Sequence, residues 1–213
     1  MTSSTSDPDP PSLNPRIYTT AQLEQIAAEF LRVYHKPPTF IPIDIELLIE
    51  RDLDISILPF SSLKAFHGIE AFITLSRKRI YVDPFLMDLD QNERRYRFTL
   101  AEEVSHAILH KDLFKNVRTP EDYIALYDKL GWETYRWMDR NAKYLAGAIL
   151  MPAPIFEAKA SEFFNGLKPG RFDSAMTMHL NVIGQLADLF QASQLSAGIR
   201  FQNLGLDRRL RLP

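Results

Sequence analysis

One stretch of the sequence, residues 98–110, constrains the fold more than any other because it reads as a single amphipathic helix. With about 100° per residue in an α-helix, about one quadrant of its surface carries four chemically active groups: Glu102, Glu103, His106 and His110. The apolar residues of the stretch occupy a separate side. The sequence therefore predicts a helix that packs through one face and presents two carboxylates and two imidazoles on the other.

Residues 102–106, EEVSH, differ by one residue from the pattern H-E-x-x-H. In that pattern two histidines bind zinc and the glutamate after the first histidine is the general base. Here Glu103 stands at the base position and His106 at the second ligand, while Glu102 takes the first ligand position. A carboxylate can bind Zn²⁺ at about 2.0–2.2 Å, so the substitution changes the type of ligand without necessarily removing it. A solvated polar face on a surface helix is the open alternative.

Composition limits the classes of protein to consider. The 213 residues, 46% hydrophobic and 24% charged, are enough for one sizeable core. Because the chain has no cysteine, any metal must be held by oxygen and imidazole nitrogen. The sequence has neither a long apolar run nor a secretory signal, so we expect a cytoplasmic protein with no membrane partner. A net charge of −2 gives no basic field, and nucleic acid is not the expected partner.

The pattern along the chain predicts a disordered tail, one domain and a basic end. Residues 1–17 are rich in Ser, Pro and Asp, residues 18–206 are expected to fold, and residues 207–213 carry the basic end. Apolar spacing predicts helices at 21–34, 43–50, 92–110, 121–129 and 132–150, the last closed by Met151-Pro152. Runs at 55–60, 71–75 and 79–83 predict a small, mainly antiparallel sheet with a hairpin connection at 76–78.

The helix predicted at 132–150 adds Asp139, which lies at the edge of its packing face. A carboxylate there must be paired, hydrogen-bonded or metal-bound, because burying an uncompensated charge is costly. An ion pair to an arginine is the simpler interpretation. The alternative is a third metal ligand from a later helix, as in the His₂Glu sites of peptidases. The two helices taken together favour the metal.

Two segments resemble the ImmA/IrrE metallopeptidase family. Residues 97–110, RFTLAEEVSHAILH, are similar to its core R-F-T-L-A-H-E-L-G-H-x-x-L-H. Residues 139–152, DRNAKYLAGAILMP, are similar to its segment E-x-x-A-N-x-F-A-x-x-L-L-M-P. The order and relative placement match, and the resemblance covers roughly residues 20–206. It implies an α+β, zincin-like minimal metallopeptidase domain over residues 18–206.

Carried over by position, the resemblance implies Glu103 as the general base. It also implies one divalent metal bound by Glu102, His106 and Asp139. Zinc is the expected ion, and Mn²⁺ or Fe²⁺ are alternatives because two carboxylates and one imidazole form a harder donor set. The extra negative charge weakens the Lewis acidity of such a metal. For His110 we expect a structural role or one as an outer partner of a ligand.

The activity implied by the resemblance is metal-dependent hydrolysis of a peptide bond in a protein substrate. A transcriptional repressor is the expected substrate, with the peptidase acting as an antirepressor. A second hypothesis is a non-catalytic regulator of the same fold that binds a partner protein through the same cleft without metal. That hypothesis predicts ion pairs from Glu102 and Asp139 to basic side chains such as Arg94, Arg97 or Arg140. Unpaired, converging ligands would favour the enzyme.

A third hypothesis, DNA binding, comes from residues 186–202, which read like a helix-turn-helix. The surface that would read DNA offers only a few polar side chains: Gln194, Ser196, Arg200 and Gln202. This is little for a recognition surface, and a helical hairpin that packs against the domain is the preferred interpretation.

Overall fold

The computed structural model describes residues 15–35, 40–167 and 174–210. The longer helices are α1 (Thr20–Tyr34), α4 (Leu89–Leu109), α6 (Pro120–Leu130), α7 (Trp132–Leu150), α8 (Ala153–Asn165), α9 (Ala175–Phe190) and α10 (Gln194–Asn203). The short helical segments are α2 (Ile45–Leu47), η1 (Leu48–Asp52), α3 (Leu63–His67), η2 (Leu75–Arg77), η3 (Pro84–Met87), α5 (Lys111–Phe114) and α11 (Leu206–Arg209). The strands are β1 (Ser56–Pro59), β2 (Ala71–Thr74) and β3 (Arg79–Val82). The fold is α+β, as the sequence predicts.

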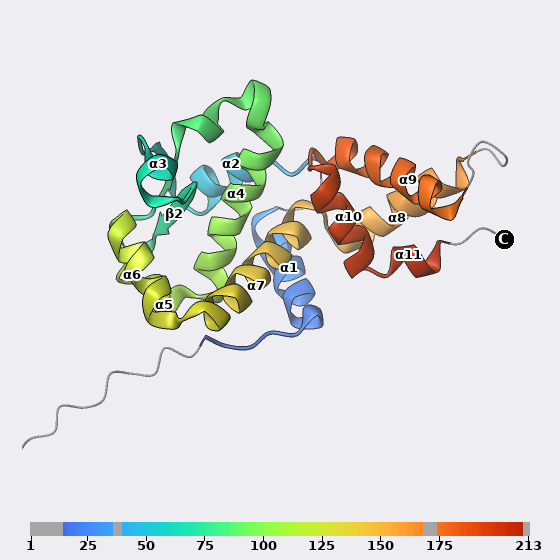
Figure 1. Cartoon of the computed structure of the whole chain (residues 1–213). Coiled ribbons are helices and arrows are strands. Elements are labelled where there is room, and N and C mark those ends of the chain that lie inside the picture. Colours follow the sequence, from blue (N-terminus) through green and yellow to red (C-terminus); the bar gives the residue numbers. More distant parts are fainter. Residues whose placement is uncertain (1–14, 36–39, 168–173, 211–213) are drawn as a thin grey trace, which may run out of the picture.

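Helix α4 is the central element of this fold (Figure 1). It packs against α7 on one side and against β2 on another, and α1 covers α7. The apolar face of α4 supplies Leu100, Ala101 and Val104, each at most 1% exposed. Helix α7 contributes Met138 and Leu145, both fully buried. Long-range packing of two amphipathic faces therefore fixes how the polar residues of α4 and α7 meet.

The sheet has three strands in the order β1-β3-β2. Strands β2 and β3 form the expected antiparallel hairpin, connected through η2. Strand β1 pairs with β3 in parallel, so the sheet is mixed and the expectation of a mainly antiparallel sheet is wrong on this point. The reason is the crossover: α3 and β2 lie between β1 and β3 along the chain, which allows the two strands to run in the same direction.

Helices α8 to α11 gather at one end of the molecule, away from the sheet (Figure 1). Phe156 of α8 and Phe190 of α9 are fully buried, with ring centroids 5.3 Å apart. Arg200 of α10 is only 2% exposed, and it donates to the carbonyl of Met151 and to the carboxylate of Glu24. The C-terminal helices are thereby tied to α1 and to the end of α7.

Most predicted helices begin and end close to the expected residues, and α7 has the predicted bounds. The helix expected at 43–50 is instead a short α-helical turn followed by the π-helical η1. Residues 1–14 of the expected tail lie outside the described part of the chain, and residues 15–17 form no helix or strand. In the described residues, no helix combines the length and apolar character needed to cross a bilayer.

Candidate functional site

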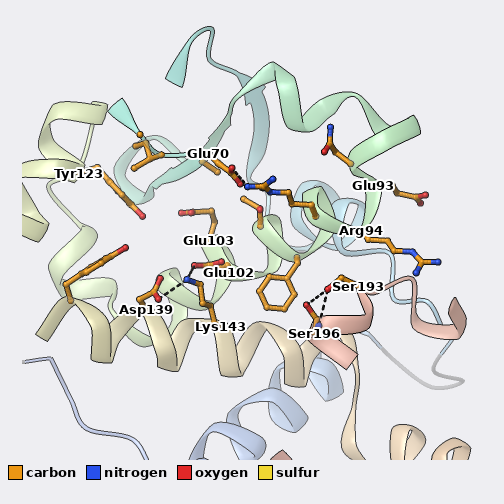
Figure 2. A pocket seen from close by; sticks show the side chains of 18 residues that line it. Glu70, Glu93, Arg94, Glu102, Glu103, Tyr123, Asp139, Lys143, Ser193 and Ser196 are labelled. Atoms are coloured by element: carbon orange, nitrogen blue, oxygen red, sulfur yellow. Dashed lines mark hydrogen bonds and ion pairs between the residues drawn. The ribbon is translucent and has the colours of Figure 1, made fainter. Parts of the chain in front are cut away.

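A cavity of about 780 Å³ lies between α4, α7 and the residues that lead into β2 (Figure 2). Three of the four predicted site residues line it: Glu102 and Glu103 from α4, and Asp139 from α7. Tyr123, Tyr135 and Lys143 also line it. The two helices that carry the sequence motifs therefore do bring their carboxylates to one place.

Lys143 joins two of these carboxylates. Its Nζ lies 2.8 Å from Asp139 Oδ2, one turn earlier on α7, and 3.9 Å from Glu102 Oε1 on α4. Figure 2 shows the lysine side chain rising from α7 to the two acids. Burial works against its charge, but the hydrogen bond to Asp139 and the Glu102 carboxylate raise the pKa of Lys143 above its usual value. The site therefore already contains a stable cation.

Burial raises the pKa of Glu102 to about 7; the charge of Lys143 opposes this rise, and the adjacent Asp139 carboxyl adds to it. The side chains of Glu102 and Asp139 are 19% and 23% exposed. Two carboxyl groups so close together repel each other when both are ionised. The ammonium of Lys143 is the group in this cluster that offsets the repulsion.

Glu103 points into the same cavity from a more buried position. The residue is 4% exposed, and its Oε2 atom has no hydrogen-bond partner among the described residues. Burial and the neighbouring Glu102 raise the pKa of Glu103 well above its usual range, although the backbone amide of Ile73 donates to its carboxylate. A buried acid without a charged partner is costly for the fold.

His106, the fourth predicted residue, is not among the residues that line the cavity. It is 1% exposed, and its Nδ1 lies 3.1 Å from the Nδ1 of His110. Its ring packs on Phe114, with centroids 5.1 Å apart. Burial lowers the pKa of both histidines, that of His110 to about 4, so the pair is neutral and shares one hydrogen bond. His110 is thus the hydrogen-bond partner of His106 Nδ1, and its role beside a metal ligand stays a prediction.

The arrangement does not fit the predicted metal site. A divalent cation between Glu102 and Asp139 would have to displace the Lys143 ammonium or lie beside its like charge. His106 uses one ring nitrogen for His110. Within residues 15–35, 40–167 and 174–210, no group of three histidine, aspartate or glutamate side chains is positioned to hold a metal ion.

Sequence reasoning missed Lys143, although it expected a basic partner for Asp139. Two of the three arginines considered for this role are used elsewhere: Arg94 pairs with Asp188, and Arg97 donates to the carbonyl of Ile43. The signal was available, because an aspartate and a lysine four residues apart on a helix are neighbours. Lys143 also stands where the family segment E-x-x-A-N has asparagine.

A sequence model of the IrrE N-terminal-like domain, Peptidase_M78, matches residues 62–202, about two thirds of the chain. The chain belongs to this family. The match includes α4 and α7 and therefore the whole cavity, and it makes the domain a metallopeptidase-like one. A comparison with curated proteins found no match to this chain.

The fold also occurs in a solved structure. A Mycobacterium tuberculosis transcriptional regulator superposes with a TM-score of 0.56 at 17% sequence identity, covering 91% of this chain and 50% of the regulator. The chain thus spans about half the length of that protein. At this identity the likeness concerns the fold alone.

Proposed function

We propose that this protein is a regulatory member of the family that binds a partner protein without metal or catalysis, with the Lys143 ammonium in place of the metal ion. One observation carries the proposal: Lys143 Nζ lies 2.8 Å from Asp139 Oδ2 and 3.9 Å from Glu102 Oε1. These are the two carboxylates that the metal would need. The ammonium supplies one positive charge without requiring a ligand sphere.

Three departures from the family pattern form one consistent set in this interpretation. The ligand positions carry Glu102 and Asp139 instead of histidine and glutamate, and Lys143 replaces asparagine. A site that had simply decayed would have no reason to keep two acids and gain a cation within reach of both. The partner that we propose is a transcriptional regulator in the cytoplasm. The solved structure of similar fold is itself a transcriptional regulator, which is consistent with a regulatory setting for this fold.

The second candidate is the metal-dependent endopeptidase, with Glu102, His106 and Asp139 holding zinc, manganese or iron and Glu103 as the base. A specific observation favours it: Glu103 has an unpartnered carboxylate oxygen and lines the same cavity. The substrate would be a protein such as a repressor. This function requires Lys143 to leave the two carboxylates and His106 to bind the metal through Nε2, because its Nδ1 bonds to His110.

A zinc titration followed by isothermal calorimetry separates the two candidates. The wild-type chain should show no stoichiometric binding, because Zn²⁺ must displace a paired ammonium. Lys143→Asn, which installs the family residue, should bind Zn²⁺ more tightly by about tenfold or more, since removing one like charge nearby is worth at least about 1.4 kcal/mol. Lys129→Asn, at an exposed lysine of α6, is the matched control. One tightly bound Zn²⁺ in the wild type, unchanged by Lys143→Asn, contradicts the proposal.

A further inference from the structure

The inner end of the cavity has more carboxylates than cations. Glu102, Glu103 and Asp139 face a single ammonium, that of Lys143. The arginines nearer the opening do not change this balance, because Arg94 pairs with Asp188 and Arg95 pairs with Glu70. The inner end of the cavity therefore holds three acidic side chains and one cationic side chain.

The Glu103 carboxylate indicates where a guest cation would bind in the cavity. Its Oε2 is buried and has no partner in the described part of the chain, and Lys143 makes no ion pair with it there. Figure 2 shows the Glu103 carboxylate directed into the cavity on the side of Tyr123, away from Lys143. An unpartnered carboxylate oxygen with 4% residue exposure requires a donor. Charge-assisted donors are the strongest ones available to it.

Aromatic rings border the same end of the cavity. Tyr123 and Tyr135 line it, and Tyr127 holds them in a row, with ring centroids 4.5 Å from Tyr123 and 4.4 Å from Tyr135. The Tyr127 hydroxyl donates to the Tyr123 hydroxyl at 2.7 Å, which fixes the two rings further. Aromatic faces attract ammonium and guanidinium groups, and they tolerate the aliphatic stem that carries such a group.

We propose that the cavity receives a lysine or arginine side chain from a partner protein, with its cationic head against Glu103 and its stem along Tyr123 and Tyr135. This inference rests on the proposed function, because a metal at the same carboxylates would compete with the guest. Lys143 is the internal precedent: it shows that an ammonium is accepted by this acid cluster. A volume of about 780 Å³ leaves room for the guest side chain and for part of its backbone.

The rim of the cavity suits such a guest. Gly68 and Glu70 lie at the approach to β2, and Asn92 and Glu93 lie near the start of α4. Glu93 is exposed and forms no ion pair with a described residue. A basic segment of a partner is thus drawn toward the opening by the exposed Glu93 carboxylate, and Arg94 and Arg95 at the opening are both paired.

The test uses three pentapeptides, Ac-Ala-Ala-Lys-Ala-Ala-amide, the same peptide with Nε-acetyl-lysine, and the same peptide with norleucine. Each is titrated into the ¹⁵N-labelled full chain in buffer with EDTA, and amide shifts are followed by NMR. The lysine peptide should bind and shift the amides of Glu103 and Tyr135. Its affinity should exceed those of the two neutral peptides by about tenfold, the effect of one charge-assisted contact.

Glu103→Gln should remove this preference for lysine, whereas Glu133→Gln, the same change outside the cavity in the first turn of α7, should keep it. If Glu103→Gln does not fold, Tyr135→Leu replaces it, with about twofold to fivefold weaker binding of the lysine peptide expected from the lost aromatic face. Equal affinity for the lysine and acetyl-lysine peptides, or no binding of either, overturns the inference.

The design also separates the inference from the proposed function. A parallel titration with Zn²⁺ alone reports whether the chain holds a metal. Lysine binding in EDTA together with no Zn²⁺ binding supports both. Stoichiometric Zn²⁺ binding overturns the proposed function. If the lysine peptide still binds in EDTA, the result supports a guest site that exists only when the metal is removed. If the wild-type chain shows no preference for the lysine peptide and binds no Zn²⁺, the guest site is overturned and the metal-free regulator stands.

Discussion

At the scale of single residues, the site depends on which cation balances Glu102 and Asp139. The sequence identified both carboxylates, and it identified the physical requirement that Asp139 have a partner. It did not decide between a metal and a side chain, because this depends on the distance from Lys143 to α4, a contact between helices that are far apart along the chain. The hydrogen bond between His106 and His110 could not be predicted from the sequence either. Two histidines one helical turn apart can bind the same metal ion or bond to each other.

The buried acid gives a prediction at the same scale. We expect Glu103→Gln to be more stable than the wild type at neutral pH. The raised pKa of Glu103 means that folding at this pH requires either a buried charge or uptake of a proton, and glutamine avoids both. A gain of about 1 kcal/mol raises the thermal midpoint by about 2–4 °C for a chain of this size. Thermal denaturation by circular dichroism measures it, and a lower midpoint would show that Glu103 is not a source of strain.

At the scale of elements, the predictions succeeded where local signals are strong. Helix α7 is bounded by Gly131 and by Met151 with Pro152, both visible in the sequence. Helix α8 was not expected, although Pro154 lies in its first turn, where proline is tolerated. The π-helical η1 and the parallel pairing of β1 with β3 depend on tertiary packing, and no local pattern specifies them.

The contact between α1 and α10 gives a prediction about elements. Glu24→Gln should destabilise the fold by about 2–4 kcal/mol, because it leaves the buried guanidinium of Arg200 without its counter-charge. Urea unfolding measures the loss. Glu29→Gln on the same helix, whose partner Arg32 is exposed, is the control and should change stability little. Equal effects of the two substitutions would mean that Arg200 finds another partner.

The same contact sets a pH dependence. Burial opposes the charge of Glu24, but hydrogen bonds from Arg200 and Tyr144 hold its pKa below the usual 4.5. The folded pKa is thus below the unfolded one, so the stability from this pair is complete above about pH 4.5 and is lost as the pH falls through the folded pKa. The difference between wild type and Glu24→Gln in urea unfolding should therefore shrink from about pH 6 to about pH 3. A constant difference would contradict this.

At the scale of the whole molecule, the surroundings of α4 determine how its motif is used. Helical periodicity separated an apolar face from a polar one, but the fold covers both: Glu103, His106 and His110 are each at most 4% exposed. Burial of the polar face is a global property, because α7 and β2, which pack against α4, come from other parts of the chain. The sequence could therefore predict the residues of the site and not their environment.

The C-terminal helices argue against the DNA-binding hypothesis. Helices α9 and α10 do form a helical pair, as a helix-turn-helix would. However, Arg200, the basic residue of the second helix that would have to reach DNA, is 2% exposed and bound to Glu24. The pair packs on the rest of the domain, which agrees with the preferred interpretation as a packing hairpin.

If the Lys143 ammonium occupies the place of the metal, the purified protein should contain no bound metal ion. Elemental analysis would be made on protein purified without chelator and dialysed against Zn²⁺ or Mn²⁺, with wild type beside Glu102→Ala and Asp139→Ala. We predict far less than one metal ion per chain in all three, with no difference among them. Near-stoichiometric metal in the wild type that falls in both variants would contradict the claim and establish a metal centre built from these carboxylates.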